Sequence, residues 1–296
     1  MGTLFNSKLI ASEIQDSVGD EIWKIRQLFK IEPVIAMIIL DHEDSLKMAE
    51  LGIYSALGNQ LGITIREIIL DPSIVEDQLI RVIYKCNANP SIHGILVLSP
   101  LPKHIDQEKV LSTISPNKEI EGFNENKNQS DFEGKQNSVW AALLKVTSAI
   151  QLDIFNSQCV FILDNFTLCN ATMKKILEKT RFFQIPPTIV TKETDHVKEI
   201  TQKADLLAVS LQTPGIIDKN YIKDDATVID FNHIIIGEKY CEKKCAVIPL
   251  TKSSLNVDSL LTKAKYVLPA ADGIEPVSLA HLMRNFLYNY KTAVFR

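Results

Sequence analysis

Cysteine chemistry is the first possibility that the residue types suggest. The five cysteines are an odd number, and Cys241 and Cys245, four residues apart, lack the close second pair that a structural zinc site usually needs. The first residues also lack the charged and then apolar layout of a secretory signal. We therefore predict no disulfide framework and no metal site, and we expect a reducing compartment, the cytoplasm or the mitochondrion.

A proline-bounded apolar stretch is the better candidate for a binding site. Residues 93–102 read HGILVLSPLP, in which five of the six residues from 94 to 99 are apolar and two are β-branched. This pattern predicts a strand buried on both faces, which the two prolines end. Small ligands bind outside the carboxyl ends of parallel strands, so residues 98–103 would form one wall of a pocket. The alternative is a core strand with a proline-stiffened exit and no ligand.

Repeated strand–helix units must position this stretch. Apolar residues recur every three or four positions in the predicted helices, and the predicted strands are short apolar runs such as VIAMIIL. We predict strands at residues 34–40, 63–70, 94–99, 159–164, 187–191, 204–211 and 227–231. We predict helices at residues 7–30, 46–61, 75–87, 105–115, 139–150, 172–179, 196–203 and 276–290. This alternation predicts an α/β protein with two lobes, each built on a mostly parallel sheet.

Length and charge restrict the partners. The chain has 296 residues, which is enough for two domains of about 150 residues each. Its formal net charge of -4 gives no electrostatic case for binding nucleic acid or an anionic membrane. No apolar run approaches the ~18 residues that a membrane span requires. We therefore expect no nucleic-acid partner and no membrane partner.

Five stretches, in this order along the chain, resemble the bifunctional methylenetetrahydrofolate dehydrogenase/cyclohydrolases. They read HGILVLSPLP, PNKEIEGF, ADLLAVSLQTPGII, IKDDATVID and LPAADGIEPVSLAHLMRN. The resemblance implies a folate-binding-type lobe at residues 1–145, which the C-terminal helix at 274–296 joins. It also implies a Rossmann-like lobe for NADP or NAD at residues 146–273, a cleft between the lobes, a folate-type ligand and a homodimer.

The catalytic positions that the resemblance assigns have changed. In the family, a helix carries a tyrosine and, four residues later, the lysine that drives cyclohydrolase chemistry, and these positions hold Glu50 and Tyr54 here. The family's glutamine that supports this lysine is replaced by Leu98 here, and Glu121 stands at the position of the carboxylate expected to hold the pterin ring. A phenol of pKa ~10 does not replace a mobile cation in acid–base work. Lys47 lies seven residues before Tyr54, about 10 Å along a helix, and is a poor substitute.

The cofactor positions depart further from the family. Leu163, Asp164 and Asn165 stand where the family has its Gly-Arg-Ser start, and Asn170 and Asn232 replace later glycines. Glycines let the backbone approach cofactor phosphates, and Asp164 adds a negative charge, so we predict that this loop binds phosphate weakly or not at all. The remaining positions that the resemblance assigns to the cofactor are Gln212 and Thr213.

The resemblance also assigns substrate-binding positions. They are Pro100 and Leu101 after the proline-bounded strand, Pro269 and Gly273 before the last helix, Pro276 at the start of that helix, and Glu50 on the predicted helix at 46–61. Asp272 and Glu275 replace glycines of the stretch before the last helix. We interpret His281 as a helix-face residue, Cys169 as a buried thiol, and Lys127 and Lys135 as solvated loop charges.

Two hypotheses stay open. In the first, the chain keeps the two-lobed fold, lacks cyclohydrolase and dehydrogenase activity, and serves as a binding or partner subunit, with a folate-binding regulator as one form of it. In the second, the chain is a working NAD(P)-dependent methylenetetrahydrofolate dehydrogenase, because hydride transfer does not need the lysine. Titration with NADP, NAD and a folate analogue separates them.

Overall fold

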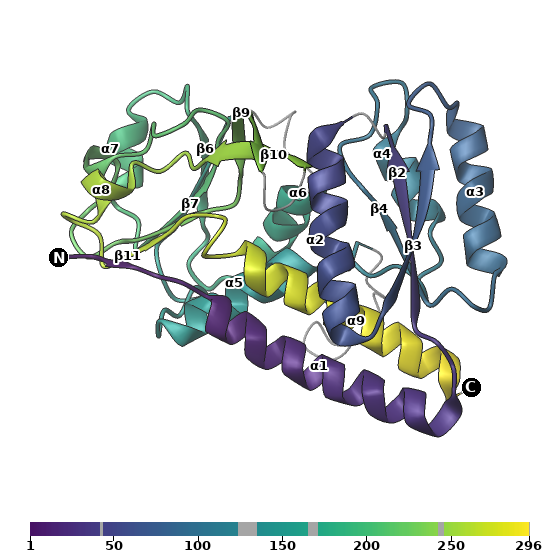
Figure 1. Ribbon diagram of the computed structural model, residues 1–296. Coiled ribbons are helices and arrows are strands. Elements are labelled where there is room, and N and C mark those ends of the chain that lie inside the picture. Colours follow the sequence, from purple (N-terminus) through teal and green to yellow (C-terminus); the bar gives the residue numbers. More distant parts are fainter. Residues whose placement is uncertain (42–43, 124–134, 165–170, 242–245, 296) are drawn as a thin grey trace. The chain divides into compact units, whose positions relative to one another are not determined.

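The chain folds into two compact units, which are described here one at a time. The computed structural model describes residues 1–41, 44–123, 135–164, 171–241 and 246–295 (Figure 1). Unit 1 comprises Met1–Ala11, Val139–Gly237 and Leu250–Leu279, and unit 2 comprises Ser12–Ser138, Glu238–Pro249 and Ala280–Arg296. Two helices, α1 (Lys8–Phe29) and α9 (Glu275–Val294), begin in unit 1 and continue into unit 2.

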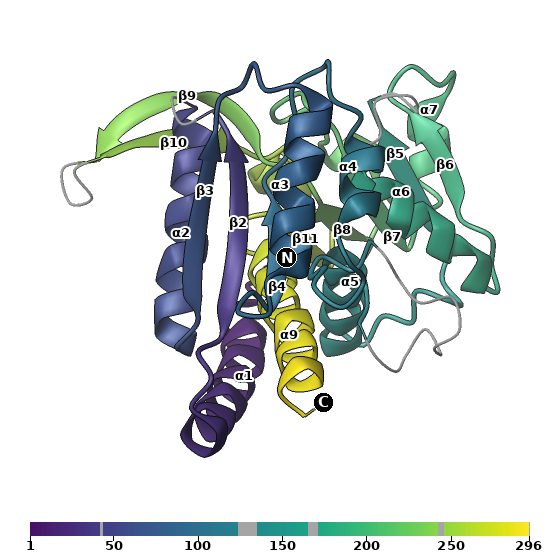
Figure 2. The same cartoon turned by 90° about the vertical axis from the view of Figure 1, so that its right-hand side faces the viewer.

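Unit 2 is built on a three-stranded parallel sheet of order β3-β2-β4. The strands β2 (Val34–Leu40) and β4 (Gly94–Val97) are buried throughout, whereas β3 (Thr64–Leu70) at the edge consists of exposed and half-buried residues. The helices between and after these strands are α2 (Ser45–Leu61), α3 (Glu76–Ala88) and α4 (Gln107–Thr113). Figures 1 and 2 show α2 and α3 on opposite sides of the sheet. Continuous apolar runs form β2 and β4 because both faces of these strands are covered.

The later part of α9 packs directly on the sheet of unit 2. A Cβ atom built on Gly94 of β4 would lie 2.7 Å from the ring of Phe286 in α9 and 3.1 Å from Ile120. The hydroxyl of Tyr290 donates a hydrogen bond of 2.6 Å to the carbonyl of Ile31. Residues near the C-terminus therefore complete a core formed by the first half of the chain.

Unit 1 is built on a six-stranded parallel sheet of order β1-β11-β8-β7-β5-β6. In chain order its strands are β1 (Thr3–Leu4), β5 (Cys159–Leu163), β6 (Thr188–Thr191), β7 (Leu206–Ser210), β8 (Thr227–Asp230) and β11 (Tyr266–Leu268). Its helices are α5 (Ser138–Ala149), α6 (Ala171–Glu178), α7 (Val197–Thr201) and α8 (Val257–Leu260), with 3-10 turns η1 (Lys179–Phe182) and η2 (Lys219–Tyr221). A separate two-stranded sheet contains β9 (Ile234–Cys241) and β10 (Ala246–Lys252).

The predicted α/β fold, with a parallel sheet in each of two units, is confirmed. The structure differs from the expected lobe boundaries at the start of the chain, because β1 pairs with β11 and places Met1–Ala11 in unit 1. Helix α5 also belongs to unit 1 from Val139 onward. Among the described residues, no helix is long and apolar enough to cross a membrane.

Candidate functional site

The carboxyl ends of β2 and β4 form the first candidate site, which lies within unit 2. From the central strand β2 the chain leads to β3 on one side and to β4 on the other, and ligands bind outside the strand ends at such a reversal. The N–H of Leu98 donates 3.0 Å to the carbonyl of Ile38, so pairing continues one residue beyond β4. Leu98 is buried, Pro100 is exposed and Leu101 is half-buried. Pro100 and Leu101 thus follow the end of β4, as predicted.

Helix α2, which also belongs to unit 2, carries Lys47, Glu50 and Tyr54. Tyr54 is buried and Glu50 is half-buried. The ammonium of Lys47, whose side chain is 8% exposed, donates 2.8 Å to the carbonyl of Leu40 and lies 3.9 Å from the carboxylate of Asp44. Lys47 therefore sits at the end of β2, and its ammonium fixes the first turn of α2 to that strand.

The segment that carries Glu121 is held by hydrogen bonds that the sequence interpretation missed. The carboxylate of Glu119, which is 1% exposed, accepts the N–H groups of Glu121 at 2.5 Å and Gly122 at 3.0 Å. The side-chain amide of Asn289 in α9 donates 2.9 Å to the carbonyl of Glu119, and that of Asn285 donates 2.9 Å to the carbonyl of Ile120. The four-residue spacing of Asn285 and Asn289 on one helix face was the available signal.

Lys135 is not the solvated loop charge that we expected. Its ammonium donates to the carbonyls of Pro116 and, at 3.0 Å, Glu119. Burial lowers the pKa of this lysine. The polar composition of its neighbourhood suggested an exposed side chain, but the carbonyl of the exposed Pro116 and that of the buried Glu119 provide acceptors for its ammonium. Lys127 lies outside the described residues.

The environment of Glu121 favours the neutral form of its carboxyl. Burial, and then the nearby carboxylates of Glu119 and Glu50, raise the pKa of Glu121 well above its ordinary value. The pair of Glu50 and Glu121 is therefore close enough to interact electrostatically. A neutral carboxyl both donates and accepts hydrogen bonds, so this group can match the donor and acceptor edge of a polar heterocycle.

His93, the first residue of the stretch HGILVLSPLP, has a structural role. It precedes β4 and so lies at the amino end of that strand, opposite Leu98. Its Nδ1 accepts a hydrogen bond of 3.3 Å from the N–H of Val34, and its ring meets Tyr290 edge to face with centroids 5.1 Å apart. Burial lowers the pKa of His93. These contacts place it in the core.

The second candidate site lies in unit 1, at the carboxyl ends of β5, β6 and β7. The chain leaves β5 for β6 on one side and later adds β7 on the other, so the reversal of strand order lies between β5 and β7. The carboxylate of Asp164, directly after β5, accepts the backbone N–H of Gln212 at 2.5 Å and pairs with the ammonium of Lys192 at 2.8 Å. Asp164 and Gln212 are thus brought together. Asn165 and Asn170 lie outside the described residues, as does Cys169.

Polar residues after β8 fix the neighbouring loop. The carboxylate of Asp230, fully buried, accepts hydrogen bonds from Ser253, Ser254 and the N–H of Asn232. Burial raises the pKa of Asp230, although these hydrogen bonds oppose that shift. The amide of Asn232 donates 3.1 Å to the hydroxyl of Ser210. Asn232 therefore ties β8 to β7, while Thr213 is exposed.

The loop before α9 also belongs to unit 1 and contains Pro269 and Gly273, whereas Pro276 is the second residue of α9. A Cβ on Gly273 would lie 2.9 Å from the carbonyl oxygen of Pro269, so this turn needs glycine. The imidazole of His233 contacts the carboxylate of Glu275 at 2.5 Å. Sequence reasoning singled out Glu275 only as a replaced glycine and did not identify His233 as its partner.

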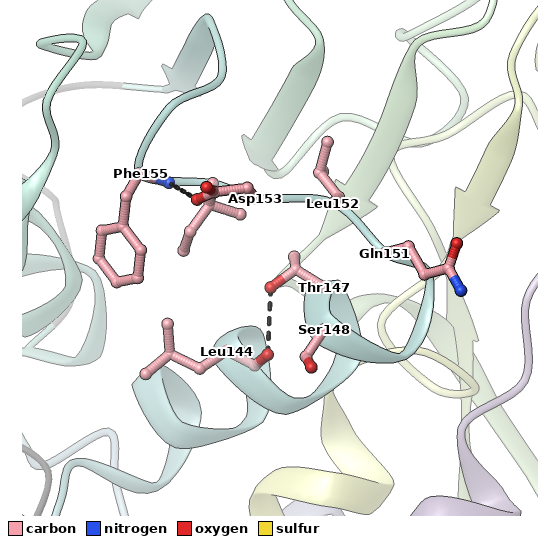
Figure 3. A pocket seen from close by; sticks show the side chains of 8 residues that line it. Leu144, Thr147, Ser148, Gln151, Leu152, Asp153 and Phe155 are labelled. Carbon is pink, nitrogen blue, oxygen red and sulfur yellow. Dashed lines mark hydrogen bonds between the residues drawn. The ribbon is translucent and has the colours of Figure 1, made fainter.

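A cavity of about 330 Å³ in unit 1 contains none of the predicted site residues. It lies at the end of α5 and in the loop after it (Figure 3). Two of its polar side chains are bonded locally, because Thr147 donates 2.7 Å to the carbonyl of Leu143 and Asp153 accepts the N–H of Phe155 at 3.0 Å. Within the part of the chain that the structure describes, no cluster of His, Cys, Asp and Glu could hold a metal ion.

Comparison with known proteins links both units to one family. Residues 5–121 match the family model described as tetrahydrofolate dehydrogenase/cyclohydrolase, catalytic domain, and residues 140–294 match the NAD(P)-binding domain of the same description. The chain is 27% identical to the bifunctional protein FolD of Agathobacter rectalis over 289 residues, which covers 96% of this chain and 98% of that protein.

Two solved structures have the same fold. One is the Trypanosoma brucei methylenetetrahydrofolate dehydrogenase-cyclohydrolase complexed with NADP and inhibitor, with a TM-score of 0.81, 19% identity and coverage of 100% of this chain and 99% of that one. The other is a 5,10-methylenetetrahydrofolate dehydrogenase from the silkworm Bombyx mori, with a TM-score of 0.79, 20% identity and coverage of 100% of both chains.

Proposed function

The chain belongs to the tetrahydrofolate dehydrogenase/cyclohydrolase family of folate metabolism, and from this premise we propose that it is a divergent, non-catalytic member. It binds a folate-type molecule in unit 2 and does not hydrolyse the methenyl bridge. The observation that carries the proposal is the joint replacement of the lysine and glutamine positions by Tyr54 and Leu98, both buried. The homodimer that the resemblance implies stays a prediction.

The missing cation supports the loss of cyclohydrolase activity. Opening the methenyl bridge needs an activated water and a positive charge beside the developing negative charge. Tyr54 provides neither a mobile charge nor a base, and Leu98 cannot align a neighbouring group by hydrogen bonding. Lys47 does not replace the lysine, because its ammonium bonds to the carbonyl of Leu40.

The retained carboxyl at Glu121 supports folate binding. Its backbone is fixed by the Glu119 carboxylate, which accepts the Glu121 N–H. Its raised pKa favours a neutral group that donates as well as accepts. A pterin ring presents donors and acceptors along one edge, which is the pattern that such a carboxyl can bind.

The residues at the carboxyl ends of β5, β6 and β7 do not fit the cofactor phosphates that the family implies. The N–H of Gln212 and the ammonium of Lys192, which could bind a phosphate, already bind the Asp164 carboxylate. We therefore derive no hydride-transfer step. A working dehydrogenase remains the alternative, and it requires cofactor binding at these strand ends or elsewhere in unit 1.

Calorimetric titration of the purified chain with a tetrahydrofolate analogue, NADP and NAD tests this proposal. We expect heat of binding for the folate analogue and none for NADP or NAD at micromolar concentrations. The Glu121→Ala variant should lose folate binding, whereas Glu67→Gln, which changes an exposed carboxylate on β3, should keep it. Micromolar NADP binding by the native chain would support the working dehydrogenase instead, and no folate binding would contradict the proposal.

A further inference from the structure

The three parallel strands β6, β5 and β7 end in register at the reversal of strand order in unit 1. Leu163 at the end of β5 pairs with Thr191 of β6 on one side and with Ser210 of β7 on the other. Asp164 and Lys192 are therefore the first residues beyond their strands, and Gln212 follows two residues after β7. Open α/β sheets bind their ligands at this position.

The carboxylate of Asp164 lies across this reversal. One of its oxygens accepts the backbone N–H of Gln212 at 2.5 Å, and the other pairs with the Lys192 ammonium at 2.8 Å. Its own N–H donates 3.3 Å to the carbonyl of Ser210, which fixes the backbone at the same place. The side chain of Asp164 is 19% exposed, so the carboxylate is largely withdrawn from water.

A backbone N–H and an ammonium that converge on one anion are the groups with which proteins bind phosphate. We propose that the β5–β7 edge, formed by Asp164, Lys192, Ser210 and Gln212, is an oxyanion site in which the side chain of Asp164 takes the place of a phosphate group. The inference deepens the proposed loss of cofactor binding and rests on it. Phosphate is excluded because the N–H of Gln212 and the ammonium of Lys192 already bind the Asp164 carboxylate. Removing this carboxylate makes both groups available to phosphate.

Occupancy of the site by the Asp164 carboxylate and simple charge repulsion are two explanations for weak phosphate binding, and they make different predictions. Because Lys192 compensates the charge of Asp164, repulsion between Asp164 and phosphate is weakened before any ligand arrives. Repulsion predicts that neutralising Asp164 is sufficient for phosphate binding. Occupancy predicts that asparagine, which keeps an oxygen for the Gln212 N–H, leaves the site closed, whereas alanine opens it.

Binding of inorganic pyrophosphate to the full chain, followed by ³¹P nuclear magnetic resonance, tests this inference. The native chain and Asp164→Asn should bind weakly, and Asp164→Ala should bind at least about tenfold more tightly, because one charge-assisted contact and one backbone donor become available. Adding Lys192→Met to Asp164→Ala should abolish the gain. Adding Lys219→Met, which changes an exposed lysine of η2, should preserve it. Thermal melts of all variants establish that each is folded.

Three results would overturn the inference: native binding as tight as that of Asp164→Ala, equal gains from asparagine and alanine, or no effect of Lys192→Met. Folate titration of the same samples keeps the two proposals distinguishable, because the residues proposed to bind folate lie in unit 2 and those of the oxyanion site lie in unit 1. If Asp164→Ala does not gain pyrophosphate binding while folate binding is intact, the oxyanion site alone is rejected. The reverse pattern would reject the proposed folate function.

Discussion

At the scale of single residues, the substitutions at Tyr54 and Leu98 act as a pair. A lysine at the first position would enter a buried environment, and the second position offers no hydrogen bond to align it. Removing one transition-state donor commonly costs ~10² to 10³ in rate, and losses in a shared site need not add. The effect of restoring the lysine or the glutamine therefore depends on the residue at the other position.

Restoring both residues should recover cyclohydrolase activity better than restoring one. Tyr54→Lys alone should give little methenyl-tetrahydrofolate hydrolysis, because Leu98 still cannot support the ammonium. Tyr54→Lys with Leu98→Gln should exceed the single variant by about tenfold or more. Initial rates of hydrolysis measure this, with Leu98→Gln alone as the control. Full activity from Tyr54→Lys alone would show that the glutamine position is unimportant.

The contact between His233 and Glu275 makes stability depend on pH. The hydrogen bond that the imidazole of His233 donates to the Glu275 carboxylate, and then the charges of Glu275, Asp230 and Asp272, hold the pKa of His233 above its usual range, although burial opposes the shift. A raised pKa in the folded state means that the stabilisation is fully present below the unfolded pKa of about 6.5. It is lost as pH rises through the folded value.

Glu275→Gln should therefore lower the free energy of unfolding more at pH 6 than at pH 9. The difference should be at most about 1 kcal/mol, because both side chains are about a third exposed. Urea denaturation at the two pH values measures it. Glu199→Gln, which removes the carboxylate beside the exposed His196, is the matched control and should show a smaller difference. An equal loss at both pH values would contradict a titrating pair.

At the scale of elements, Gly94 sets how closely α9 approaches β4. A methyl group there would lie 2.7 Å from the Phe286 ring and 3.2 Å from Ile35. Gly94→Ala should reduce the free energy of unfolding by about 1–3 kcal/mol, because the packed core must shift. Gly52→Ala in α2, where nothing lies within 4 Å, should instead stabilise by up to about 1 kcal/mol. Urea denaturation of both variants checks this, and equal effects would contradict it.

Long apolar elements were predictable from sequence, whereas short pairing segments were not. The run VIAMIIL gave the bounds of β2, Val34–Leu40, because burial on both faces leaves a continuous apolar pattern. β1 has two residues and β11 has three, and their pairing depends on partners more than two hundred residues apart. No local pattern encodes such a contact, so the position of the N-terminal residues was missed.

At the scale of the whole molecule, the sequence indicated candidate site positions but not the residues that they contact. Asp164 was noticed as a misplaced charge, but its pairing with Lys192 requires β5 and β6 to be neighbours. Asn285 and Asn289 gave a helical spacing, but their acceptors at Ile120 and Glu119 lie far away in sequence. The types of residue at a site follow from motifs, and their hydrogen bonds follow from topology.

The most direct test of the account is the rate of methenyl-tetrahydrofolate hydrolysis by the purified native chain. With Tyr54 and Leu98 at the lysine and glutamine positions, the rate should equal the spontaneous rate, and Glu121→Ala should leave it unchanged. Steady hydrolysis above the spontaneous rate that Glu121→Ala abolishes would contradict the account, because it would show that this site catalyses the reaction by another route.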